Sequence, residues 1–251
     1  MELTFLFYVL VGFVAQVIDG ALGMAYGVSS NTFLLSLGLP PAAASASVHM
    51  AEVVTTGISG AAHWRLGNID WKLVQRLLIP GVVGGTAGAY LLTSIDGDII
   101  KPYIAGYLLL MGMYIIYKAF RNNTHVNDGT HTARVSLLGL VGGFCDAIGG
   151  GGWGPVVTTT LVARGKNPRL TIGSVNFSEF FVTFAESVTF VLTLAFSQYW
   201  QIILGLLLGG AIAAPLAARV TKKLPIKALM ALVGTLIVLL SIRTIYLSLM
   251  Q

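Results

Sequence analysis

The chain has 251 residues, of which 55% are hydrophobic and 10% are charged, and its formal net charge is +5. An average soluble domain has roughly 25% charged residues, and a soluble fold of this length has no means of covering so much apolar surface. The composition therefore excludes an ordinary soluble domain and predicts an integral membrane protein.

Apolar residues are concentrated in long runs, which lie at 1–17, 73–94, 103–120, 200–218 and 226–250. Several runs reach the ~20 residues that a helix needs to cross a ~30 Å hydrocarbon core. The runs do not alternate apolar and polar residues, as the strands of a membrane barrel do. We therefore expect an all-α polytopic protein of the cell (inner or plasma) membrane. The first run lacks the basic start and the cleavage site of a signal peptide, so we expect it to belong to the mature fold.

Each half of the chain begins with the same pattern. In the first half an apolar arm at 3–18 is followed by a glycine-rich break at 19–27 and a short arm at 28–37. The second copy has its arms at 135–145 and 155–163, around a break at 146–154. Neither arm alone spans a bilayer comfortably, so each pair predicts a glycine-broken re-entrant helical hairpin. Three transmembrane helices are expected to follow each hairpin.

The two halves are related in sequence. A shift of 127 positions aligns 12–56 with 139–183 without a gap, and 13 of the 45 aligned pairs are identical, including Asp19 with Asp146 and Glu52 with Glu179. The match predicts a first membrane repeat at 1–120, a polar cytoplasmic linker at 121–134 and a second membrane repeat at 135–251.

Basic residues predict the orientation of the two repeats, because loops rich in Lys and Arg stay in the cytoplasm. The turns at 38–41, 94–98 and 197–200 have no Lys or Arg. The first hairpin is then expected to enter from outside and the second from the cytoplasm, as inverted-topology repeats whose substrate site lies near the midplane. The basic loops contain Arg65, Lys72, Arg76, Lys118, Arg121, Arg134, Arg164, Lys166, Arg169, Arg219, Lys222, Lys223 and Lys227.

The two breaks are the candidate substrate site. Glycine lets a backbone turn sharply and approach a ligand closely, and the free N–H groups at the start of the following helix suit an anion. Close helix packing is the structural alternative for these glycines, but it does not explain a repeated aspartate. The expected binding residues are Asp19, Gly20, Gly23, Tyr26, Ser29 and Asn31 in the first half, and Asp146, Gly149, Gly150, Gly151, Gly152, Trp153 and Thr158 in the second.

Ionisable residues in the predicted spans are candidates for proton coupling or for a transport pathway, because such groups are costly inside a membrane. Glu52 and Glu179 are repeat partners, and His49 and Asn176 precede them by three residues on the same helix face. Glu186 has Ser59 as its repeat partner, so the two halves need not contribute equally. Hydrogen bonding of the broken backbone is the structural alternative for the glutamates.

The glycine-rich stretch at 145–155, its weaker echo at 18–23 and the two matching halves resemble the sulfite exporter TauE/SafE family. The resemblance implies a transporter that exports a small sulfur-containing anion, such as sulfite or a sulfonate, with coupling to protons. The first break departs from the glycine-rich pattern, because it has Leu22, Met24 and Ala25 where the second has Gly149, Gly151 and Gly152.

Other functions also fit part of the sequence. Paired Asp and Glu residues also suit a cation exchanger. An uncoupled anion channel is a further alternative function. The run at 57–60 is similar to the serine motif of rhomboid proteases, but no later span has the histidine that such an enzyme needs. We therefore expect no enzymatic activity, no cofactor, no metal site, and no nucleic-acid partner. The expected partners are the anionic substrate and membrane lipid. Formation of a homodimer is a further alternative.

Overall fold

The computed structural model describes residues 2–22, 25–120, 132–164, 166–194, 199–220 and 226–250. Within these ranges every regular element is a helix, as the composition predicted. The first half has α1 (Glu2–Leu22), α2 (Tyr26–Ser36), α3 (Pro41–Arg65), α4 (Trp71–Ser94) and α5 (Gly97–Phe120). The second half has α6 (Thr132–Gly149), the π-helix η1 (Gly154–Thr158), α7 (Thr159–Ala163), α8 (Pro168–Thr193), α9 (Trp200–Val220) and α10 (Ile226–Leu249).

Four of these helices, namely α4, α5, most of α8 and the larger part of α10, are long and apolar enough to cross a membrane. Apolar stretches of α1 and α9 are shorter. Large apolar side chains such as Leu6, Ile79 and Tyr103 are exposed on the outer faces of the helices. Such exposure is expected where lipid, and not water, surrounds the fold.

Local sequence explains where the long helices begin. Pro41 and Pro168 occupy the first turns of α3 and α8, where the missing N–H group of proline costs nothing. Asn167 accepts hydrogen bonds from the N–H groups of Arg169 and Leu170 and so caps α8. Asp70 caps α4 in the same way.

Three predicted boundaries shift in the structure. The helices before the breaks extend through Leu22 and Gly149, so that Asp19 and Asp146 lie in their last turns and not in the breaks. Residues 132–134, which the sequence assigned to the linker, form the start of α6. The rest of the linker, at 121–131, lies outside the described residues.

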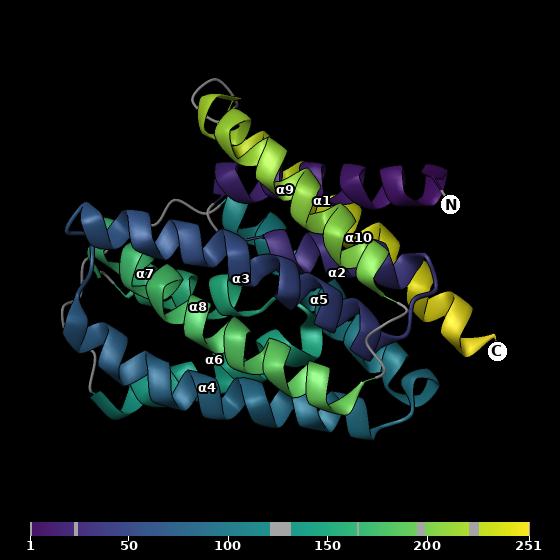
Figure 1. The fold of residues 1–251 in the computed structure, drawn as a ribbon, viewed down its shortest axis with the longest axis horizontal. Coiled ribbons are helices and arrows are strands. Elements are labelled where there is room, and N and C mark those ends of the chain that lie inside the picture. Colours follow the sequence, from purple (N-terminus) through teal and green to yellow (C-terminus); the bar gives the residue numbers. More distant parts are fainter. Residues whose placement is uncertain are drawn as a thin grey trace.

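Helix packing repeats itself between the halves. Helix α1 packs along α9, and its repeat counterpart α6 packs along α4. In these pairs Gly12 lies against the backbone of Leu206, and Gly139 against the backbone of Leu77. Figure 1 shows α3 and α8 between these two pairs.

The central helices α3 and α8 run antiparallel. Gly60 contacts Phe177, Gly57 contacts Phe180, and His49 contacts Glu186, so the end of α3 lies beside the beginning of α8. The loop after α3 is fixed to α8 by hydrogen bonds from Arg169 Nε to Asn68 Oδ1 (2.5 Å) and from the Asp70 N–H to Ser174 Oγ (2.7 Å). These contacts position the cavity described next.

Candidate functional site

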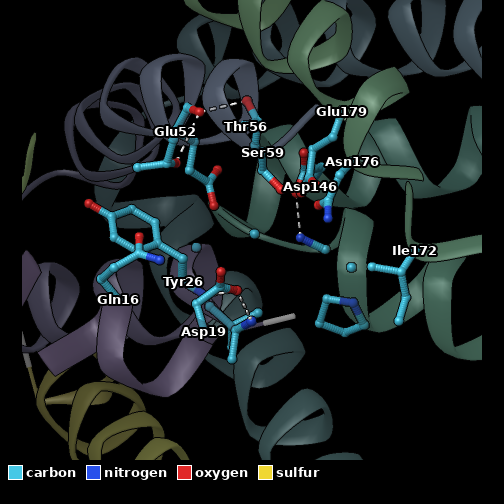
Figure 2. Close-up of a pocket in the computed structure, with 18 of the residues that line it drawn as sticks. Gln16, Asp19, Tyr26, Glu52, Thr56, Ser59, Asp146, Ile172, Asn176 and Glu179 are labelled. Carbon is cyan, nitrogen blue, oxygen red and sulfur yellow. Dashed lines mark hydrogen bonds between the residues drawn. The ribbon is translucent and has the colours of Figure 1, made fainter. Parts of the chain in front are cut away.

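A cavity of about 280 Å³ lies where the two breaks meet (Figure 2). Its wall is formed by residues of α1, α2, α3, α6, η1, α8 and both breaks. The lining includes both residues of each acidic repeat pair, Asp19 with Asp146 and Glu52 with Glu179. The remaining lining residues are Gln16, Ala25, Tyr26, Gly27, Val28, Thr55, Thr56, Ser59, His63, Gly151, Gly152, Gly154, Pro155, Ile172 and Asn176.

The two aspartates hold the broken backbone. Oδ1 of Asp19 accepts hydrogen bonds from the N–H groups of Ala25 (2.9 Å) and Tyr26 (3.3 Å). Oδ1 of Asp146 accepts from Gly152 (2.6 Å) and Trp153 (2.9 Å). Hydrogen bonding of the broken backbone was the structural alternative predicted for the glutamates. In the structure the aspartates form these hydrogen bonds. Each carboxylate links the last turn of one helix to the start of the next.

The two breaks touch each other. A Cβ atom on Gly27 would lie 2.6 Å from the carbonyl oxygen of Gly150 and 2.6 Å from Cα of Gly151. Gly150 and Gly151 adopt φ angles of +64° and +147°, which side-chain-bearing residues rarely adopt. Asn31 Nδ2 donates a 2.6 Å hydrogen bond to the carbonyl of Gly149, the last residue of α6. The glycines thus permit a backbone contact between segments far apart in the sequence.

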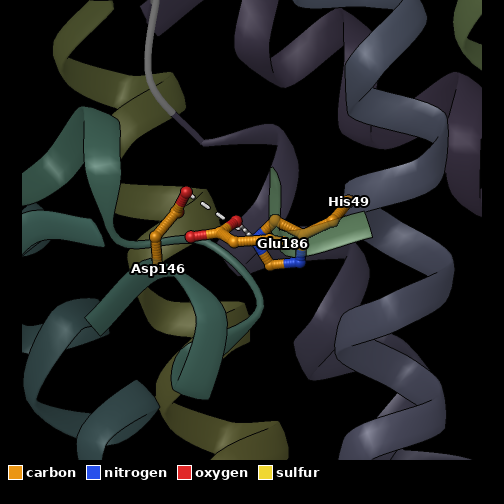
Figure 3. Close-up of side chains that lie close together, drawn as sticks. All are labelled: His49, Asp146 and Glu186. Carbon is orange, nitrogen blue, oxygen red and sulfur yellow. Dashed lines mark ion pairs between the residues drawn. The ribbon is translucent and has the colours of Figure 1, made fainter. Parts of the chain in front are cut away.

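A buried polar cluster lies beside the second break (Figure 3). His49 Nε2 is 2.8 Å from Glu186 Oε2 and 3.6 Å from Asp146 Oδ2, and all three side chains are buried. Nδ1 of His49 is 2.7 Å from the carbonyl oxygen of Ser45. Because a carbonyl can only accept, Nδ1 carries a proton. One further proton must then be shared between His49 Nε2 and Glu186.

The same three residues could also hold a metal ion, since one ligand atom from each lies within 4.8 Å of the others. His49 Nε2 and Glu186 Oε2, 2.8 Å apart, form an ion pair when His49 is protonated. Asp146 Oδ2 and Glu186 Oε1 are buried and have no hydrogen-bond partner among the described residues.

Glu52 and Glu179, the two glutamates that line the cavity, have no basic side chain paired with them, within the described part of the chain, as Glu186 has. Glu52 is 5% exposed, and its Oε2 has no hydrogen-bond partner among the described residues. Its other oxygen, Oε1, lies against the start of α2, 3.0 Å from where a Cβ on Gly27 would stand. Glu179 faces the same cavity from α8. In Figure 2 both glutamates border it across from Asp19 and Tyr26.

The predicted site residues fall into three groups. Asp19, Tyr26, Glu52, Asp146, Gly151, Gly152, Asn176 and Glu179 line the cavity. Ser29, Asn31, His49, Gly149, Gly150, Trp153, Thr158 and Glu186 lie outside the lining, and Trp153 is fully buried with its indole N–H donating to the Val175 carbonyl. Gly20 belongs to α1, and Gly23 lies outside the described residues.

Several lining residues were missed by the sequence prediction. Thr56, Ser59 and His63 follow Glu52 at intervals of four, three and four residues, and Ile172 precedes Asn176 by four. These spacings place each set on one helix face. The helical periodicity that started at the glutamates was the signal for them. The carbonyl of Ser45 orients His49. Nothing in the sequence indicated this role except that Ser45 lies one helical turn before His49.

Comparisons with known proteins identify the family of the chain. The model of the family "Sulfite exporter TauE/SafE" matches residues 8–244. The "Probable membrane transporter protein YtnM" of Bacillus subtilis (strain 168) is 43% identical over 246 residues, which cover 95% of this chain and 81% of that protein. The "Probable membrane transporter protein YdhB" of the same organism is 28% identical over 165 residues, or 63% of each chain. No solved structure matches the chain.

The extent of these matches decides the family. The family model spans nearly the whole chain, including both breaks and both acidic repeat pairs. The fold is all-helical in its described part and has membrane-length apolar helices. The chain is a membrane transporter that belongs to the sulfite exporter TauE/SafE family.

Proposed function

We propose that the protein is a secondary transporter that exports a small sulfur-containing anion, sulfite or an organosulfonate, with coupling to protons. One observation carries the proposal: the two glycine-rich breaks and both acidic repeat pairs border a single cavity. Family membership supports the substrate class, since the family is described as a sulfite exporter. The cavity volume of about 280 Å³ is sufficient for an anion of this size.

The start of α2 offers the anion its donors. The first N–H groups of a helix have no partner within it, and Asp19 takes those of Ala25 and Tyr26. The next two N–H groups belong to Gly27 and Val28, which line the cavity and are not hydrogen-bonded to any described residue. Together with the helix dipole, they provide an anion-binding end without Lys or Arg.

We also propose that the two halves are inverted repeats in the membrane. The antiparallel packing of α3 and α8, which are repeat counterparts, supports this orientation. The cavity extends to His63 in the last turn of α3 and to Ile172, one turn into α8. Arg65 and Arg169 lie at this end, so the basic residues assign it to the cytoplasm. The cavity is therefore open toward the compartment from which an exporter collects its substrate.

A cation exchanger is the second candidate, and a specific observation favours it. The lining has four carboxyl groups and, among the described residues, neither Lys nor Arg. Carboxylate and carbonyl oxygens are the usual ligands of Na⁺ and Ca²⁺. Either candidate requires that the cavity open alternately to the two sides of the membrane.

Reconstituted protein separates the two candidates. Uptake of radiolabelled sulfite into proteoliposomes should be saturable and should be reduced by unlabelled sulfonates, while Na⁺ and Ca²⁺ leave it unchanged. Uptake of Ca²⁺ or Na⁺ without any sulfite flux would reject the anion transporter. Labelling from outside should reach residues 38–41 and not 164–169, and labelling of both segments from one side would reject the inverted repeats.

A further inference from the structure

We infer that the anion crosses the membrane together with protons held by Glu52 and Glu179, so that the protein is an anion–proton symporter. The inference rests on the proposed function and assigns it a coupling direction and two proton-binding residues. Four carboxyl groups reach the cavity wall from four helices, and none of the described residues that line it is Lys or Arg.

The four carboxyl groups are not equivalent. Asp19 and Asp146 each accept two backbone hydrogen bonds at the breaks, which compensate a negative charge. Glu52 has no such donor on its buried Oε2. No side-chain hydrogen bond of Glu179 is formed with any described residue, although the threonine one turn later donates to its backbone carbonyl. The glutamates are therefore the two acids whose charge the protein leaves uncompensated.

Other titratable groups near the glutamates do not supply the missing positive charge. Asp19 on α1, Tyr26 on α2, His49 on α3, Asp146 on α6 and Glu186 on α8 interact with them electrostatically. His49 is the only base of this set, and its contact with Glu186 at 2.8 Å makes a pair of zero net charge when His49 is protonated. His63, which also lines the cavity, lies at its outer end in the last turn of α3.

An arriving anion changes the balance in favour of protons. At about 5 Å and an effective dielectric constant of about 20, each ionised glutamate would weaken anion binding on the order of 100-fold. A protonated glutamate removes this repulsion and gains an O–H donor for an oxyanion oxygen. Anion binding must therefore draw protons onto the glutamates, and the two species occupy the cavity together.

Simultaneous occupancy fixes the direction of coupling. An antiporter needs anion and proton to exclude each other, which is the opposite of what carboxyl groups facing an anion do. A cell that accumulates the anion would release it with protons, and the outward anion gradient would drive the cycle. Cation exchange predicts the reverse linkage, because a bound cation would displace protons from the same carboxyl groups.

The pH dependence of anion binding tests the inference on the whole purified protein. Stabilisation against thermal unfolding is titrated with sulfate, thiosulfate and ethanesulfonate between pH 5.5 and 8.5, since these anions do not themselves titrate in that range. For each proton taken up, affinity should rise about tenfold per unit decrease in pH wherever the glutamates are ionised in the free protein. Affinity that is independent of pH, or that falls with acidification, would overturn the symport.

Glutamine variants locate the protons. Glu52→Gln and Glu179→Gln mimic the protonated side chain, so each variant should bind the anion more tightly than wild type at pH 8.5. In each variant, anion affinity should also depend less steeply on pH. The double variant should lose this pH dependence entirely, while the exposed control Asp98→Asn keeps the wild-type slope of affinity against pH. A full slope in the double variant would overturn the assignment to these residues, and the wild-type slope tests the direction even where a variant does not fold.

The two proposals fail differently. If none of these anions nor sulfite stabilises the wild-type protein at any pH, the proposed function itself is wrong. If Na⁺ or Ca²⁺ stabilises it with release of protons, cation exchange replaces both proposals. In proteoliposomes without an initial anion gradient, a pH gradient should drive anion accumulation on the alkaline side in wild type. The double variant should exchange anion without accumulating it.

Discussion

An aspartate in the last turn of the preceding helix holds each break, and the two aspartates differ in what surrounds them. Asp19 is partly exposed to the cavity, and its two backbone hydrogen bonds measure 2.9 and 3.3 Å. Asp146 is 1% exposed, its bonds measure 2.6 and 2.9 Å, and its second oxygen faces His49. The cap is thus common to both halves, while the buried ionic cluster belongs to the second break alone.

The aspartate has one role at the first break and two roles at the second. Each aspartate uses one oxygen to hold the backbone, which leaves the other available. In the second half that oxygen lies beside a histidine supplied by the first half, at 3.6 Å. The repeat partner of His49 is Asn176 and that of Glu186 is Ser59, so the cluster cannot be formed twice. Similar backbone geometry therefore coexists with unequal chemistry.

The largest effect is expected where the breaks touch. Gly151→Ala would force a side chain into a φ of +147° and against the backbone of Gly27 and Val28. Backbone strain of roughly 1–3 kcal/mol and overpacking of similar size together predict a loss of roughly 2–6 kcal/mol in unfolding free energy. Gly38→Ala is the control, because its φ is +91° and nothing lies within 4 Å of the added atom. Equal losses in denaturant unfolding would mean that the contact between breaks adds nothing.

The ionic cluster should show the next effect. His49→Gln or Glu186→Gln alone leaves one buried partner uncompensated, which costs about 3 kcal/mol in unfolding free energy. The double variant should cost less than the sum of the singles by roughly 0.5–3 kcal/mol, as for residues in direct contact. Chemical unfolding of the four proteins measures the coupling. Strict additivity would show that the pair at 2.8 Å does not interact.

The asparagine variants of Asp19 and Asp146 should differ in transport rate. Asparagine keeps a carbonyl oxygen for the backbone N–H groups and removes the charge, so the cap persists in both variants. Asp146→Asn also removes the buried negative charge that lies 3.6 Å from His49 Nε2, and because a broken buried ion pair costs about 3 kcal/mol, we expect initial flux to fall on the order of 100-fold. Asp19→Asn, which has no such neighbour, should lose about tenfold. Wild-type flux in purified Asp146→Asn would contradict a functional role for the cluster.

Sequence reasoning could find the acidic pairs because a repeat offset of 127 places them in register, and the structure brings all four to one cavity. It could not find the contact of His49 with Glu186, because that contact depends on how α3 and α8 cross. It also ended the helices at the aspartates, since glycines there suggested a break. Helix α6 continues through Gly149, and Asn31 caps its end across the fold.

The smallest effect concerns the aromatic residues that follow the two breaks. Tyr26 and Trp153 are repeat partners that contact the counterpart glycines Gly210 and Gly81. The Tyr26 hydroxyl donates a 3.1 Å hydrogen bond to the carbonyl of Leu206 in α9. Tyr26→Phe removes this bond and keeps the ring, so unfolding free energy should fall by only about 1 kcal/mol.

Trp153→Phe is the matched change in the second half. It removes a hydrogen bond of 3.2 Å to Val175 and also leaves space beside Gly81, because the smaller ring no longer fills the fully buried site. A residual cavity adds its own cost to that of the lost bond, so Trp153→Phe should destabilise more than Tyr26→Phe in the same thermal unfolding experiment. The opposite order would mean that the first break, despite its partly exposed aspartate, is the more tightly packed of the two.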